Sequence, residues 1–70
     1  ELFDALKKWR IETARKYRTR VYLILSNETL ELIALNRPQT FDELRALKGI
    51  GPVKLTDYGQ QLLKIVEKHV

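Results

Sequence analysis

The sequence lacks cysteine and methionine, and it holds one histidine, one serine and one tryptophan. Without cysteine there is no disulfide framework and no thiolate to bind a metal, and this absence fits a reducing, intracellular setting. The longest uninterrupted apolar run, residues 21–25, has five residues, whereas a helix that spans a bilayer needs about 20. No signal-peptide pattern is present either. The sequence thus predicts neither a secreted disulfide scaffold nor a membrane protein.

The chain is also short, and its reactive side chains do not converge. Seventy residues allow one domain, whose small core would compete with a deep pocket for apolar side chains. Because the sequence starts at Glu1, we expect residues 1–70 to be one domain of a longer protein. His69 stands alone near the end, and Ser26 has the context of a helix cap. We therefore predict no catalytic residue, no metal ligand and no cofactor.

What the chain does contain is a concentration of positive charge. Its formal net charge is +4. Residues 7–20 hold seven basic residues against one acid, Glu12, so this segment carries +6 and the rest of the chain carries −2. A solvated helix face would explain such a segment. The local asymmetry favours instead a surface that binds a polyanion.

Apolar residues at helical spacing predict a first helix over residues 2–17. Its inner stripe consists of Leu2, Leu6, Trp9, Thr13 and Tyr17, widened by Phe3 and Ala14. Residues 18–25 lose this period. We interpret them as an extended, buried connector, because a single strand could not satisfy its own backbone groups.

Capping residues predict where the next two helices begin. Ser26 or Asn27 offers an N-cap oxygen, and Pro38 ends the second helix by disfavouring helical geometry in the residue before it. Thr40 and Glu43 form a capping box at the start of a third, short helix. The inner faces of these two helices are assigned to Leu30, Ile33, Ala34 and Leu35 and to Phe41, Leu44 and Leu47.

Glycines mark the end of the pattern. Residues 49–52, Gly-Ile-Gly-Pro, predict a tight turn, and Pro52 suits the first position of a fourth helix. Gly59 is interpreted as a break before a fifth, terminal helix. The apolar residues of these two helices are Val53, Leu55 and Tyr58, then Leu62, Leu63, Ile65 and Val66. The whole pattern predicts an all-α fold.

Two segments are candidates for binding a polyanion. In the first, four cations lie within six residues and are followed closely by Tyr22; they are Arg15, Lys16, Arg18 and Arg20. Cations that track phosphates beside an aromatic ring that stacks on a base are typical of single-strand binding. Tyr17 is assigned to the core of the first helix. For Tyr22, an exposed base contact and ordinary packing both remain open.

The second candidate is the turn between the third and fourth helices. Gly49 and Gly51 would expose backbone N–H groups beside a helix N-terminus, which attracts phosphate, and Lys48 and Lys54 flank them. The alternative is that the turn only packs two helices closely, with Ile50 in the core. The segment lacks the Gly-Lys-Ser/Thr ending of a Walker-type nucleotide site.

The order of these features resembles the HRDC domain, the helicase and RNase D C-terminal domain, over essentially all seventy residues. The matching residues are Leu2-Phe3, Leu6, Trp9-Arg10, Ala14, Tyr22-Leu23-Ile24-Leu25-Ser26-Asn27, Thr29-Leu30, Arg37-Pro38, Leu44, Leu47, Gly49-Ile50-Gly51-Pro52, Lys54-Leu55 and Tyr58-Gly59. The resemblance implies a small orthogonal bundle of about five helices with a helix-hairpin-helix-like Gly-Ile-Gly turn. Many members place a Gly- and Pro-containing turn after the first helix, but residues 17–21 have neither. This departure leaves open a first helix longer by one turn.

The resemblance also implies a function. The host would be a RecQ-type DNA helicase, a UvrD-type helicase or RNase D. In a helicase, the domain would be a monomeric auxiliary unit that contacts single-stranded or junction DNA without sequence specificity, through Tyr22 and nearby cations, and lies beside the helicase core. Alternatives are a protein-docking module and the RNA-binding domain of an RNase D-type nuclease. The expected location is the nucleoid of the bacterial cytoplasm or the nucleus.

Overall fold

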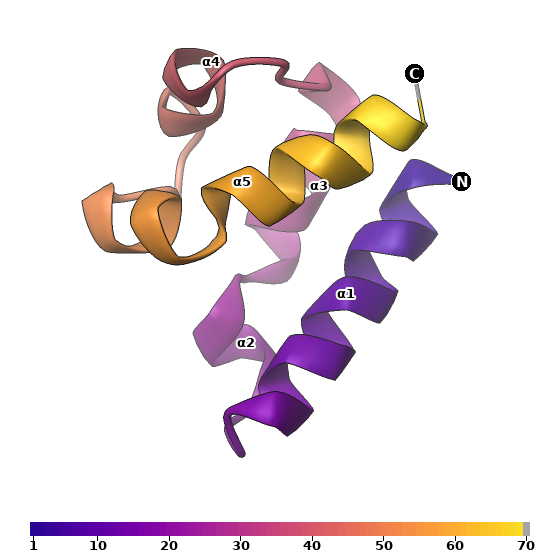
Figure 1. Cartoon of the computed structure of the whole chain (residues 1–70), viewed down its shortest axis with the longest axis vertical. Helices are drawn as coiled ribbons and strands as arrows, with labels where there is room; N and C mark the ends of the chain where they lie inside the picture. The colour runs from indigo at the N-terminus through magenta and orange to yellow at the C-terminus, as the bar shows by residue number, and fades with distance from the viewer. Residues whose placement is uncertain (70) are drawn as a thin grey trace.

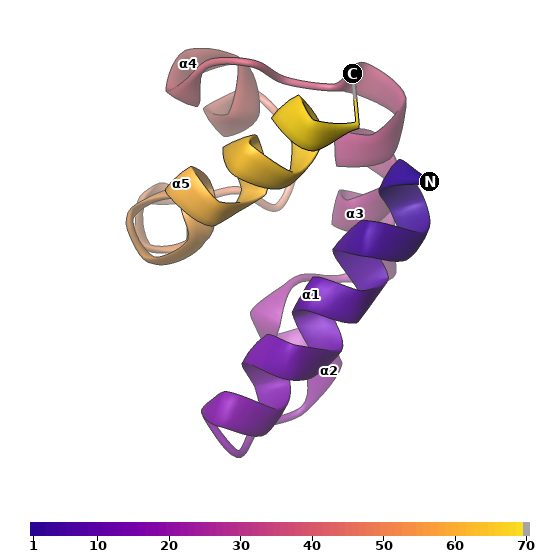
Figure 2. The same cartoon turned by 45° about the vertical axis from the view of Figure 1, so that its right-hand side comes forward.

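The computed structural model describes residues 1–69, and within that range the chain forms five helices and no strand. They are α1 (Leu2–Lys16), α2 (Val21–Ile24), α3 (Asn27–Asn36), α4 (Phe41–Arg45) and α5 (Pro52–Lys68) (Figure 1). The helices cross one another instead of running parallel, and the start of α1 lies near the end of α5 (Figures 1 and 2). The predicted all-α bundle of about five helices is confirmed.

Every helix contributes to one core. The side chains that are almost fully buried are Leu6, Ile24, Leu25, Leu30, Ile33, Leu44, Leu62 and Val66. Helix α1 contacts α2, α3 and α5, and α4 packs on α5. The Trp9 ring meets the Tyr58 ring edge-on, with centroids 5.4 Å apart, and Trp9 Nε1 donates a hydrogen bond to Gln61 Oε1 at 2.8 Å. These contacts fix α1 against α5.

The predicted helix caps are confirmed. Ser26 is the N-cap of α3, and its hydroxyl accepts a hydrogen bond from the Thr29 N–H at 3.2 Å. At α4, the Thr40 hydroxyl accepts from the Glu43 N–H at 3.1 Å. The Glu43 carboxylate reaches back to the Gln39 N–H at 2.7 Å. Local sequence sets these helix starts because the donor and acceptor lie within four residues of each other.

The predicted break at Gly59 is wrong, because α5 runs without interruption from Pro52 to Lys68. Gly59 is buried under α4. A Cβ atom at this position would lie 3.0 Å from Phe41 Cε1 and 3.2 Å from Leu55 Cδ1. A glycine inside a helix costs about 1 kcal/mol relative to alanine. Its missing side chain leaves room for the Phe41 ring against α5.

Several apolar residues assigned to inner faces lie outside the core. Leu35 is 80% exposed, and Val53 and Phe41 are also exposed. The helices α3 and α4 have ten and five residues, and each contributes only a narrow stripe to the core. Leu30, Ile33 and Leu44 fill that stripe. Leu35 of α3 and Phe41 of α4 therefore remain in contact with solvent.

Candidate nucleic-acid interface

Helix α1 ends in a turn that needs neither glycine nor proline. The Arg18 N–H donates to Arg15 O at 3.2 Å and the Thr19 N–H to Ala14 O at 2.9 Å. This pair of bonds is the Schellman motif, whose left-handed position is usually glycine. Arg18 takes that position with φ 55°. The helix therefore stops at Lys16, one residue before the predicted end, and does not gain a further turn.

The prediction of an extended, buried connector over residues 18–25 is half wrong. Val21–Ile24 form the single helical turn α2, between Arg20 and Leu25 in extended conformation. Ile24 and Leu25 are buried, whereas Tyr22 is 62% and Leu23 54% exposed. A helical turn distributes its side chains around an axis, so one side of α2 packs on the core and the other remains outside.

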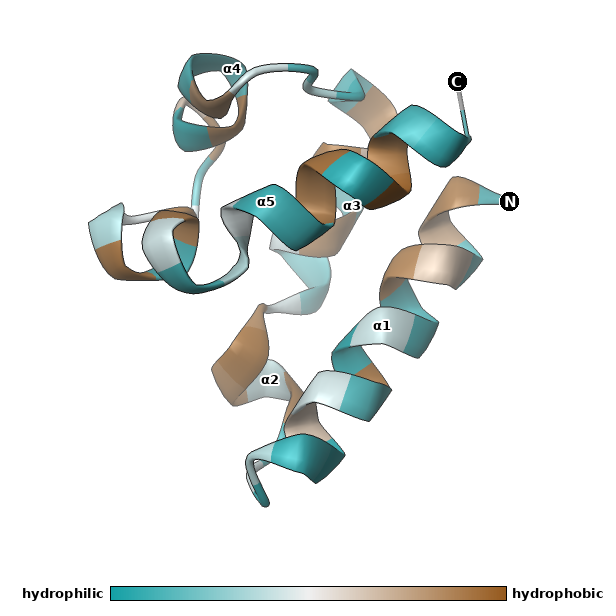
Figure 3. Ribbon diagram, in the orientation of Figure 1, coloured by the Kyte–Doolittle hydropathy of each residue, from teal (hydrophilic) through white to brown (hydrophobic). Residues whose placement is uncertain are grey.

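The exposed side chains around this turn form a surface that we call the basic patch. It consists of Arg15, Lys16, Arg18 and Arg20 with the rings of Tyr17 and Tyr22, and all six residues are exposed. The assignment of Tyr17 to the core is wrong: the residue follows the last turn of α1 and is 57% exposed. The Lys16 ammonium lies 5.6 Å from the centre of the Tyr17 ring. Figure 3 shows the hydrophilic end of α1 beside the hydrophobic turn α2.

The cations of the basic patch have no acidic partner among residues 1–69. The ion pairs in that range join Lys7 to Asp4, Arg45 to Asp42 and Lys48 to Glu28. Four positive charges at one end of the molecule are therefore available to an external anion. A groove or patch of one sign of charge raises the local concentration of oppositely charged ligands.

The Gly-Ile-Gly turn packs against the start of α3. Gly49 has φ 95°, and a Cβ atom there would clash with Thr29 Oγ1. That hydroxyl donates to the backbone oxygen of Lys48 at 3.1 Å. Ile50 is buried, and its N–H donates to Leu47 O at 3.2 Å. The close-packing interpretation thus describes Gly49 and Ile50, whereas around Gly51 a Cβ would meet nothing within 4 Å.

The two lysines beside this turn have partners within the protein. Lys54 Nζ donates to the backbone oxygens of Leu23 and Ile24, the latter at 2.7 Å. Lys48 Nζ lies 3.8 Å from the Glu28 carboxylate. Phosphate contacts at Lys48, Gly49, Gly51 and Lys54 stay predictions. The Lys54 bonds nevertheless join the first turn of α5 to α2. The two segments predicted to bind a polyanion, residues 15–22 and residues 48–54, are therefore neighbours.

Arg10 is a buried cation, although the sequence analysis counted it among the seven basic residues of the segment 7–20. It is 7% exposed, and its Nη1 donates to Leu25 O at 2.8 Å, while its Nε has no partner. Burial lowers the pKa of the Arg10 guanidinium from its usual value, but an arginine remains charged in proteins. Its spacing from Leu6 and Thr13 on the buried stripe of α1 is the signal that could have revealed it.

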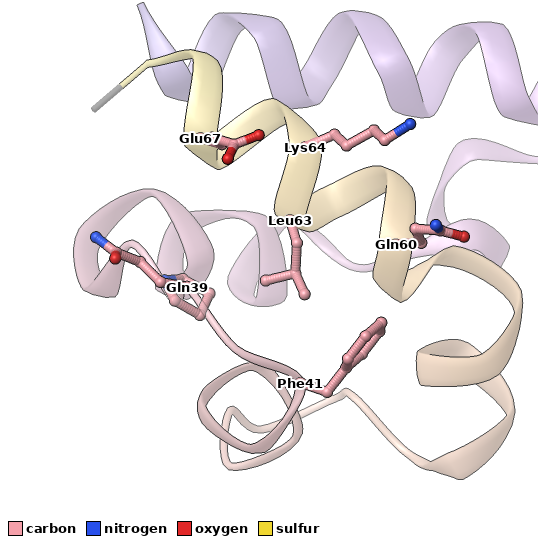
Figure 4. A pocket seen from close by; sticks show the side chains of 7 residues that line it. Gln39, Phe41, Gln60, Leu63, Lys64 and Glu67 are labelled. Carbon is pink, nitrogen blue, oxygen red and sulfur yellow. The ribbon is translucent and has the colours of Figure 1, made fainter.

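A groove of about 480 Å³ lies between α4 and α5, apart from the basic patch. It is lined by Pro38, Gln39, Phe41, Gln60, Leu63, Lys64 and Glu67, and Figure 4 shows Phe41 and Leu63 extending toward the same space. Its lining has no histidine, cysteine or hydroxyl nucleophile. In residues 1–69 no three acidic or histidine side chains gather as metal ligands, and none of the helices has the length and hydropathy to cross a membrane.

The fold and the surface together define a small bundle of five crossing helices with one basic end. The model of the HRDC domain family matches residues 1–66, and the chain belongs to this family. A solved structure titled D. radiodurans RecQ HRDC domain 3 superimposes with a TM-score of 0.93 at 28% sequence identity. The match covers 97% of this chain and 90% of that chain.

Curated relatives are named as helicases. The ATP-dependent DNA helicase UvrD2 of Mycobacterium bovis is 38% identical over 66 residues, which is 94% of this chain and 9% of the relative. The ATP-dependent DNA helicase RecQ of Bacillus subtilis is 30% identical over 69 residues, which is 99% of this chain and 12% of the relative. The chain therefore spans about a tenth of the length of these relatives.

Proposed function

We propose that the chain is an auxiliary nucleic-acid-binding domain of an ATP-dependent DNA helicase, without activity of its own. The observation that carries this proposal is the basic patch, with two exposed tyrosines and four exposed cations that have no acidic partner among residues 1–69. The names of the relatives support a helicase host. In this host the domain would bind single-stranded or junction DNA inside the cell, beside the helicase core, and so influence substrate choice.

The patch suits a strand whose bases are unpaired. Arginine and lysine attract phosphates without reading sequence, and each neutralised phosphate releases counterions, which makes affinity depend on salt. The exposed rings of Tyr17 and Tyr22 offer faces on which a free base can stack, worth about 1–3 kcal/mol per base. Bases within a duplex are already stacked and present no free face. We therefore expect non-specific binding with a preference for single strands.

A titration of the 70-residue chain with labelled single-stranded, duplex and forked oligonucleotides at low salt tests this function. We expect dissociation constants of about 10⁻⁴–10⁻⁶ M, in the range of non-specific binding. About four phosphate contacts on a single strand give a log–log salt slope near −3. Absence of binding to all three ligands at low salt contradicts the proposal.

Substitutions within the patch separate phosphate contacts from stacking. The double variant Arg18→Ala/Arg20→Ala should weaken binding to every sequence and flatten the salt slope by about 1.4. Tyr22→Ala should weaken single-strand binding by about fivefold or more with little change of slope. The matched control Lys64→Ala/Lys68→Ala removes two exposed cations from α5 and should leave the slope near that of the unmodified chain.

A second candidate function is docking to the host helicase or to another protein. The groove between α4 and α5, with the exposed ring of Phe41, favours this alternative. Amide chemical-shift mapping distinguishes the two functions. Shifts at residues 15–22 on addition of an oligonucleotide support nucleic-acid binding, whereas an unchanged spectrum with intact helices supports docking.

The nucleic acid could also be RNA, as in an RNase D-type host. Exposed cations and rings do not by themselves distinguish the two polymers, because the distinction depends on contacts to the 2′-hydroxyl. Titration with single-stranded DNA and RNA of the same sequence and length decides between them. We expect DNA to bind at least as tightly, in keeping with relatives named as DNA helicases.

A further inference from the structure

Two cations from different helices hold the C-terminal end of α2. Lys54 Nζ, on α5, donates to the oxygens of Leu23 and Ile24. Arg10 Nη1, on α1, donates to the oxygen of Leu25 at 2.8 Å. Three consecutive carbonyl groups are thus held by two positive side chains, and we call this arrangement the carbonyl clamp.

The turn α2 needs such contacts because it is too short to be stable alone. It has four residues, and isolated helices shorter than about 12–15 residues are marginal in water. Its backbone bonds include Leu23 N–H to Arg20 O at 3.0 Å and Leu25 N–H to Val21 O at 3.3 Å. The carbonyls at a helix end lack donors within the helix, and a cation there is favourable. The carbonyl clamp provides both donors and charge.

The two cations of the carbonyl clamp have no acidic partner within residues 1–69 that would compete with these carbonyls. Arg10 is 7% exposed, and neither Arg10 nor Lys54 takes part in an ion pair within residues 1–69. Burying a charged group is costly unless it is hydrogen-bonded, so the bond to Leu25 O offsets part of that cost. Tyr22, which directly precedes the three clamped carbonyls in the chain, is 62% exposed at the edge of the basic patch.

We propose that Lys54, together with Arg10, is a positioning residue of the interface: the carbonyl clamp fixes the α2 turn and thereby holds Tyr22 where a base can stack. This inference rests on the proposed function. It replaces the direct phosphate contact predicted for Lys54 with an indirect role. In this role Lys54 acts through Tyr22 and adds no counterion release of its own.

A double-mutant cycle tests the indirect role. Single-strand affinity is measured as a function of salt for the unmodified chain, Lys54→Met, Tyr22→Ala and the double variant. We expect Lys54→Met alone to weaken binding by about fivefold or more, the smallest loss expected for a displaced stacked base, with an unchanged slope. In the Tyr22→Ala background it should change affinity by less than about twofold, because coupled residues are not additive.

Lys64→Met is the matched control, since it removes an exposed lysine from the same helix. Hydrogen exchange of the Leu23 and Leu25 amides, read by NMR, should be faster in Lys54→Met than in Lys64→Met, while the Leu6 amide remains protected in both. If Lys54→Met lowers the folded fraction, Lys54→Ala is used instead, because it also removes the donors of the ammonium group but has a smaller apolar side chain.

If Lys54→Met and Tyr22→Ala lower single-strand affinity additively, and Lys54→Met flattens the salt slope by about 0.7, Lys54 contacts a phosphate directly. This result overturns the positioning role and leaves the proposed function intact. Unchanged exchange at Leu23 and Leu25 overturns it as well. If the unmodified chain binds no single strand, the proposed function is wrong, and the role of Lys54 falls with it.

Discussion

At the scale of single residues, two arginines take the left-handed conformation. Arg18 has φ 55° and Arg37 has φ 49°, and each follows the last residue of a helix or its cap. For a residue with a side chain this conformation costs about 1–2 kcal/mol relative to the right-handed one. Glycine would avoid that cost at both positions, so the presence of arginine at position 18 is consistent with a use for its charge in the basic patch.

Arg18→Gly should separate stability from binding. Relief of the left-handed strain is partly offset by the greater freedom of glycine in the unfolded chain. We expect the free energy of unfolding to stay the same or rise by up to about 1 kcal/mol. Single-strand affinity should fall, with a salt slope flatter by about 0.7. Urea unfolding and oligonucleotide titration measure the two effects.

Arg37→Gly is the control for this variant, because it changes the same residue type in the same conformation. Arg37 Nη1 donates to the backbone oxygen of His69, the C-cap of α5, at 2.6 Å. The end of α5 and the turn α2 lie at opposite ends of the molecule (Figure 1). We expect the substitution of Arg37 to leave both affinity and slope unchanged. A loss of affinity as large as that of Arg18→Gly contradicts the assignment of binding to the basic patch.

At the scale of elements, the hairpin between α4 and α5 depends on one of its two glycines. Gly49 has a positive φ and lies against Thr29 of α3, whereas Gly51 has φ −90° and open space around it. The same Gly-x-Gly pattern therefore contains one position that tolerates a side chain and one that does not. This difference comes from the contact with α3, which is distant in sequence.

Gly49→Ala should destabilise the domain by about 2–4 kcal/mol, because it adds left-handed strain and a steric clash with the Thr29 hydroxyl. Gly51→Ala should change the free energy of unfolding by less than about 0.5 kcal/mol. Urea unfolding of the two variants measures the difference. Equal destabilisation by both substitutions would mean that the hairpin does not pack on α3 as described.

At the scale of the whole molecule, the Trp9–Tyr58 contact joins α1 to α5 and so connects the basic end to the rest of the core. Burial raises the pKa of the Tyr58 phenol, and the nearby charges of Asp57 and Tyr17 raise it further. The folded protein therefore keeps this proton to a higher pH than the unfolded chain does. Stability is then lost as the pH rises past the ordinary tyrosine pKa of about 10.

Comparison of the unmodified chain with Tyr58→Phe isolates this effect. We expect the free energy of unfolding of the unmodified chain to fall more steeply between about pH 9 and pH 11. The phenylalanine variant has no proton to lose at this position, and every other titratable group is the same in both proteins. Denaturant unfolding at several pH values gives the two slopes, and identical slopes contradict a raised pKa for Tyr58.

The sequence by itself determined the features that depend on close neighbours in the chain. The caps at Ser26 and Thr40 act over three residues, and the stop before Pro38 is set by sterics between adjacent residues. The concentration of cations in residues 7–20 and the absence of a convergent reactive cluster in the sequence were likewise evident. These features, with the family resemblance, were enough to predict an all-α HRDC-like domain.

Only the tertiary structure decided which side of each element packs inward. Gly59 was expected to break a helix, but the Phe41 ring of α4 takes the space beside it. Residues 21–24 form a helical turn, and the carbonyl groups at its C-terminal end accept hydrogen bonds from Lys54 and Arg10, which lie 30 and 15 residues away from their partners. Contacts over such distances leave no local pattern, so the exposure of Tyr22 and the clamp behind it could not be read from the sequence.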